Sequence, residues 1–71
     1  MPTATKPYPV ALVVEKRNID TGIKLLVEYS REPKFALLPV DEQELIAEQL
    51  MAMNRYSVIL GQRVALYGTG E

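Results

Sequence analysis

The chain has 71 residues, enough for one domain and close to the lower size limit for folding without a disulfide or a metal. It contains no cysteine and no histidine, which excludes disulfides, thiolate or imidazole metal sites, and the Ser-His and Cys-His pairs of nucleophilic catalysis. Eight basic residues nearly balance nine acidic ones, so the charge does not indicate a nucleic-acid backbone as partner. We expect a protein that is not an enzyme and that has no cofactor, no metal and no small-molecule substrate.

The N-terminal residues lack the apolar core of a signal peptide. The longest strictly apolar run, from Val10 to Val14, is far shorter than the roughly 20 residues that span a bilayer. The absence of cysteine fits a reducing compartment. These features predict a soluble, cytoplasmic protein without a membrane partner.

Residues 1–9 contain three prolines and are expected to form an extended N-terminal arm, because proline biases its predecessor away from helix. The β-branched run 10–16 and the run 23–30 predict a β-hairpin, joined by turn-forming residues at 17–22.

One pairing register places Leu12 opposite Val27 and gives the hairpin a wholly apolar face, whereas a slip by one residue mixes both faces. The second segment also fits a helical face. In that alternative, residues 21–31 form a helix with Thr21 as its N-cap.

Residues 35–38 predict a short third strand that Pro39 ends. The clearest local signal in the sequence follows. Asp41 is an N-cap residue, and Glu44 three residues later completes a capping box. The predicted helix runs to about Asn54.

Residues 56–60 and 64–67 read as strand, with Gly61 as a bulge between them. The predicted fold class is therefore α+β, a small antiparallel sheet in β-β-β-α-β order with one amphipathic helix packed on one face. A β-α-β-α-β order is the alternative. The domain is expected to span residues 10–67, followed by a C-terminal tail at 68–71.

One string resembles a catalytic signature. Asp20-Thr21-Gly22 is similar to the motif of aspartic proteases, in which two such aspartates share a proton and activate water, and Ile59-Leu60-Gly61 resembles the second element of the retroviral-type members. The resemblance implies a DTG-type aspartic hydrolase that works as a dimer, with Asp20 as its catalytic residue. The competing interpretation is that Asp, Thr and Gly are turn formers that close the hairpin.

The basic residues predict a second alternative function. Five of them lie on or near the hairpin and two tyrosines occur in the same region, which is the pattern of a small nucleic-acid-binding module. The residues concerned are Lys16, Arg17, Lys24, Arg31, Lys34, Tyr8 and Tyr29.

The main hypothesis follows from the apolar surface that one helix cannot cover. A sheet with two apolar faces needs cover on both, and the sequence offers one helix. We expect a small protein–protein interaction module, such as a regulator, inhibitor or assembly component of phage or mobile-element type, that completes its core by self-association or partner binding. The predicted contact residues lie on the far sheet face and on the outward helix strip: Val13, Leu26, Tyr67, Ala47, Met51 and Arg55.

Overall fold

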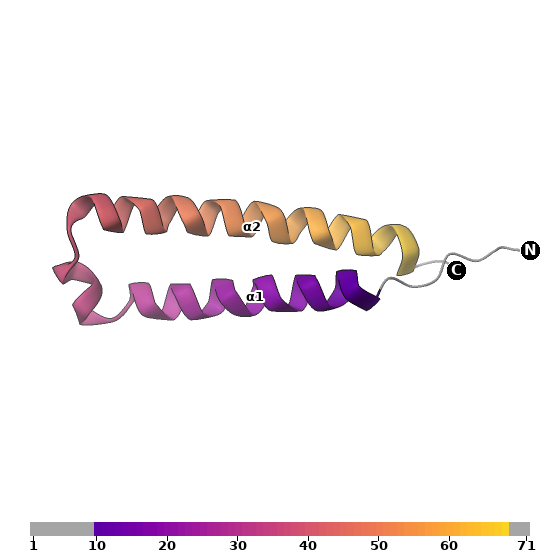
Figure 1. The fold of residues 1–71 in the computed structure, drawn as a ribbon, viewed down its shortest axis with the longest axis horizontal. Coiled ribbons are helices and arrows are strands. Elements are labelled where there is room, and N and C mark those ends of the chain that lie inside the picture. Colours follow the sequence, from indigo (N-terminus) through magenta and orange to yellow (C-terminus); the bar gives the residue numbers. More distant parts are fainter. Residues whose placement is uncertain (1–9, 69–71) are drawn as a thin grey trace, which may run out of the picture.

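The structure is a computed structural model that describes residues 10–68. Helix α1 (Val10–Ser30) and helix α2 (Val40–Gly68) lie side by side and antiparallel, and the short 3-10 helix η1 (Pro33–Leu37) joins them at one end (Figure 1). The N-terminal end of α1 and the C-terminal end of α2 lie at the opposite end of this helical hairpin.

The predicted α+β fold is wrong, in both the β-β-β-α-β and the β-α-β-α-β order. The described residues contain two long helices, one 3-10 helix and no strand. The segment 10–16 is helical although its β-branched residues favour strands, because packing against a neighbouring element outweighs a preference of this size.

The reason for two helices is a heptad pattern that runs through both segments. The positions that face the other helix are separated by alternating steps of four and three residues, the spacing of a coiled-coil seam. We call this set of buried and half-buried positions the seam: Leu12, Lys16, Ile19, Ile23, Leu26 and Ser30 in α1, and Ile46, Leu50, Met53, Ser57, Leu60 and Val64 in α2.

Helix α2 begins at Val40, next to the expected start, and Asp41 and Glu42 place negative charge in its first turn. It does not end near Asn54 but continues to Gly68. No proline interrupts this stretch, and the seam spacing continues through it, so the two strands predicted after Asn54 are part of the helix.

The loop end is held by aromatic and amide contacts. Tyr29 meets Phe35 edge to face with ring centroids 6.0 Å apart. The Gln43 side-chain amide donates to the Leu38 carbonyl oxygen over 2.9 Å. These contacts stabilise the chain reversal, which the 3-10 helix η1 forms. The third strand predicted over residues 35–38 is wrong, because most of this segment belongs to η1.

The core of the hairpin is small. Among the described residues, the buried hydrophobic side chains are Leu12, Ile46 and Leu60. Many large apolar side chains are exposed: Val10, Val14, Leu25, Leu37, Val40, Leu45, Met51, Tyr56, Val58, Ile59, Leu66 and Tyr67. Neither helix combines the length and the apolar character that crossing a membrane requires.

Candidate functional site

Three polar side chains meet in the middle of the seam. Lys16 Nζ donates to Asp20 Oδ2 over 2.8 Å and to Ser57 Oγ over 3.0 Å. The Ser57 hydroxyl in turn donates to Asp20 Oδ1. Because every member contacts the other two, Lys16, Asp20 and Ser57 form a closed network, which we call the polar layer.

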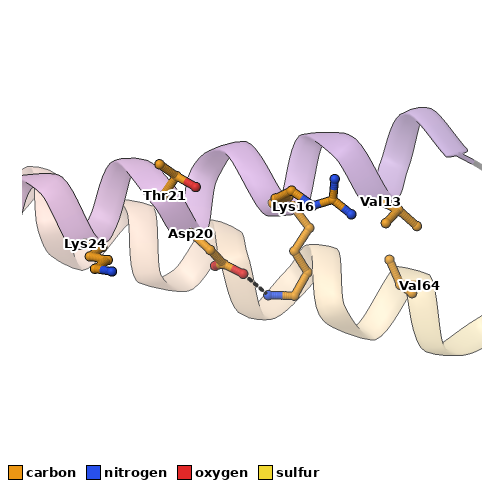
Figure 2. A pocket seen from close by; sticks show the side chains of 7 residues that line it. Val13, Lys16, Asp20, Thr21, Lys24 and Val64 are labelled. Atoms are coloured by element: carbon orange, nitrogen blue, oxygen red, sulfur yellow. Dashed lines mark hydrogen bonds and ion pairs between the residues drawn. The ribbon is translucent and has the colours of Figure 1, made fainter.

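Helix geometry explains how the polar layer forms. Lys16 and Asp20 are four residues apart on α1 and therefore lie on the same side of the helix. The stem of Lys16 crosses towards α2 (Figure 2). It passes Gly61, where an added Cβ would stand 3.3 Å from Lys16 Cε. Gly61 thus leaves room for the lysine stem, and the stem carries the charge to Ser57.

Both donors act on the carboxylate. The hydrogen bond from Lys16, and after it the one from Ser57, lower the pKa of Asp20 below its ordinary value of 3.8. The side chains of Lys16 and Asp20 are 31% and 48% exposed, so water screens this ion pair and its contribution to stability is small. Ser57 is buried, and its hydroxyl is fully engaged.

A basic pocket opens beside the polar layer. It has a volume of about 500 Å³, and its lining combines three cationic side chains and one carboxylate with Val13 and Val64, which lie together at one end (Figure 2). We call it the basic pocket; its lining residues are Val13, Lys16, Arg17, Asp20, Thr21, Lys24 and Val64. Its surplus of positive charge attracts anions.

The other flank of the hairpin carries an apolar groove of about 360 Å³. At 3.6 residues per turn, its α1 residues lie on the opposite side of the helix from Arg17 and Lys24. We call it the apolar groove; it is lined by Gly22, Leu25, Leu26, Tyr29, Gln49 and Met53. An added Cβ at Gly22 would stand 3.1 Å from Met53 Cε, the end of a flexible side chain of α2.

The structure brings together only some of the predicted contact residues. Val13 lines the basic pocket and Leu26 the apolar groove, and both residues lie in helix α1, where a shared sheet face was predicted. Ala47, Met51 and Arg55 are exposed on α2, and Met51 is 71% exposed.

The last predicted contact residue, Tyr67, lies near the end of α2 and is 37% exposed. The sequence prediction missed the polar layer altogether. The signal that could have revealed it is an oppositely charged pair four residues apart, Lys16 and Asp20, on a helical heptad pattern.

The string Asp20-Thr21-Gly22 lies inside α1 and forms neither a turn nor a protease-type loop. Ile59-Leu60-Gly61 is likewise helical, inside α2. The carboxylate of Asp20 is held by Lys16 and Ser57, whereas the resemblance implied a second aspartate as its partner.

The basic residues divide between two places. Lys16, Arg17 and Lys24 line the basic pocket, whereas Arg31 and Lys34 belong to the loop end. Lys34 lies over the Tyr29 ring, 5.8 Å from its centroid. Tyr8, the other tyrosine of the predicted nucleic-acid surface, lies outside the described residues.

Comparison with known proteins adds one finding. A family model described as Sequestin matches residues 6–66, which is most of the chain. No curated protein and no solved structure matches the chain. The family name describes a protein that sequesters. Given the extent of the match, the chain belongs to the Sequestin family.

Proposed function

We propose that this protein is a small non-enzymatic binding module that sequesters a protein partner and completes its hydrophobic core by association. The observation that carries the proposal is the mismatch between a core of three buried hydrophobic side chains and the many large apolar side chains left exposed in the described residues. The absence of cysteine is consistent with action in a reducing compartment such as the cytoplasm.

The physical reason is that two helices enclose very little volume. Ordering a helix residue costs on the order of 1 kcal/mol in backbone entropy, and burial of apolar surface must offset this cost. The hairpin buries Leu12, Ile46 and Leu60 and leaves its outer apolar side chains exposed to water. It therefore gains little stabilisation from the burial of apolar surface. Helical folds normally reach stability by covering such faces with further helices, from the same chain or from another.

A partner-binding surface is available on the outward side of α2. Val40, Ala47, Met51 and Val58 are separated by seven, four and seven residues and so fall on one line along the helix. We call them the outward strip. Met51 is 71% exposed, and its flexible thioether suits a surface that adapts to a partner. Arg55 stands beside the strip and can contribute a charged contact at its rim.

Photo-crosslinking in the cells that carry the protein tests this proposal. A benzophenone amino acid at position 51 should form a covalent adduct with a partner protein, which mass spectrometry identifies. The matched control places the same amino acid at Arg63, an exposed residue of α2 on a different side of the helix from the strip. Equal labelling from both positions, or no adduct from position 51, would contradict the proposal. An adduct of twice the 8.0 kDa chain would assign the strip to self-association instead.

The basic pocket supports a second candidate function, sequestration of a small anionic molecule. A pocket of about 500 Å³ that is lined by three cations and two valines suits a compound that has both an anionic group and an apolar part. Calorimetric titration with small phosphorylated compounds tests it, and binding should weaken in Lys24→Ala. If an oligonucleotide binds and the small compounds do not, with affinity that falls steeply in salt, the nucleic-acid alternative replaces this candidate.

A further inference from the structure

We propose that the apolar groove is covered by the same groove of a second copy, so that two hairpins form a four-helix bundle. This inference rests on the proposed function in one respect, that the hairpin completes its core by association. It adds that the partner in this association is a second copy of the chain and that this copy covers the apolar groove. The outward strip stays free in this arrangement, because it lies on the other side of α2.

The composition of the groove suits an identical partner. No charged side chain lines it, so two copies can meet there without burying like charges. Of the charged residues near these positions on α1, Arg17, Asp20 and Lys24 line the basic pocket on the opposite flank, and Glu28 is exposed and lines neither the pocket nor the groove. Leu25 is 60% exposed, so the hairpin leaves most of this side chain uncovered.

A second heptad row on α2 extends the groove. Leu45, Gln49, Ala52 and Tyr56 are separated by four, three and four residues, the spacing of a helix that packs on another helix. All four are exposed in the single hairpin, and Leu45 is 59% exposed. Helix α2 therefore has two seams side by side, one used within the hairpin and one unused.

Gln49 occupies the middle of this row and is its one member with an amide side chain. Its side-chain amide contacts Met53 Sδ at 3.8 Å, a weak acceptor that leaves most of the amide's hydrogen-bonding capacity unused. An amide both donates and accepts, so it is complementary to its own copy across a two-fold axis. A second copy would thus satisfy the polar group that an apolar partner would leave unpaired.

The available area is sufficient for a stable dimer. Helix α1 has 21 residues and is about 31 Å long, and two helices side by side are about 20 Å wide. The projected face is about 600 Å² per copy, or about 1,200 Å² for both, which reaches the lower range of stable protein interfaces.

The absence of cysteine makes a direct test simple. Gln49→Cys and Gln62→Cys place a single thiol on opposite sides of the same helix, in the groove row and outside it. A short bismaleimide should link the purified Gln49→Cys chain into a dimer and leave the Gln62→Cys chain mostly unlinked. Equal linking of the two variants, or no linking of either, would overturn the proposal.

Light scattering after size exclusion gives an independent measurement. The wild-type chain should elute with twice the mass of 8.0 kDa, and Leu25→Glu should elute at the monomer mass over the same concentrations. A wild-type chain that stays monomeric at the highest concentration would overturn the inference. That result would leave the proposed function standing if position 51 still crosslinks to a partner protein, so the two failures can be told apart.

Discussion

Lys16 of α1 and Ser57 of α2 are 41 positions apart in the sequence, and their polar atoms meet at 3.0 Å. They lie at facing positions of the seam, where apolar residues would otherwise pack. A polar pair at one level of a helical seam fixes the register, because any axial shift leaves its hydrogen bonds unmade. Lys16 and its partner Asp20 also line the basic pocket, so the lysine that fixes the register takes part in the pocket as well.

The polar layer should contribute measurably to stability. Ser57→Ala removes the hydroxyl that accepts from Lys16 and donates to Asp20, and it should lower the free energy of unfolding by about 1 kcal/mol. Urea unfolding followed by circular dichroism measures this change. Gln62→Ala on the exposed side of α2 is the control and should change stability by less than about 0.5 kcal/mol. An unchanged midpoint in Ser57→Ala would show that the layer does not stabilise the hairpin.

The stability should depend on pH through Asp20. Its pKa is lowered in the folded hairpin, chiefly by the hydrogen bond from Lys16, so the folded state favours the carboxylate more than the unfolded chain does. The resulting stabilisation is present above the ordinary value of 3.8 and is lost as the pH falls through the lower folded-state pKa. The melting temperature of the wild type should exceed that of Asp20→Asn at neutral pH, and the gap should close in acid. A gap that is constant with pH would contradict this assignment.

The two glycines of the seam region should respond differently to alanine. Both substitutions gain helix propensity of about 0.5–1 kcal/mol. At Gly22 the new Cβ meets the end of the flexible Met53 side chain, which can move into the groove, so Gly22→Ala should raise the melting temperature. At Gly61 it meets the stem of Lys16, whose ammonium group is held by two hydrogen bonds. Gly61→Ala should therefore be less stable than Gly22→Ala, and the reverse order in thermal unfolding would refute this explanation.

Two of the residues predicted to bind a partner should behave differently as glutamates. Met51 is exposed, so Met51→Glu should keep the helix content and melting temperature and lose the partner. Leu26 is half-buried in the seam, so Leu26→Glu places a carboxylate among apolar side chains and should cost about 2–4 kcal/mol. Circular dichroism during heating compares them. Equal unfolding of both variants would mean that Met51 is also part of the packed core.

Some parts of the candidate site could be predicted from the sequence, and the reason is that they are local. Pro39 followed by Asp41 and Glu42 marks the start of α2 through the preferences of the first turn alone. The exposure of Met51 on α2 follows from the position of that residue on a helix that was recognised. The predicted end of this helix, near Asn54, was wrong, because the apolar residues of 56–67 fit both a strand pattern and a helix pattern.

By itself, the sequence determined the chemistry that is excluded and the surplus of apolar surface. Without histidine and cysteine, the Ser-His and Cys-His nucleophile pairs and the metal sites with thiolate or imidazole ligands cannot form in any fold. A chain of 71 residues of which 48% are hydrophobic cannot bury all of these residues. The tertiary structure decided the secondary structure of 10–30. Its β-branched residues and its Asn-Asp-Thr-Gly content favour strands and a turn locally, and only packing against α2 makes the heptad spacing decisive. The contact between Lys16 and Ser57 is equally non-local, since no preference of either residue for its neighbours specifies a partner 41 positions away.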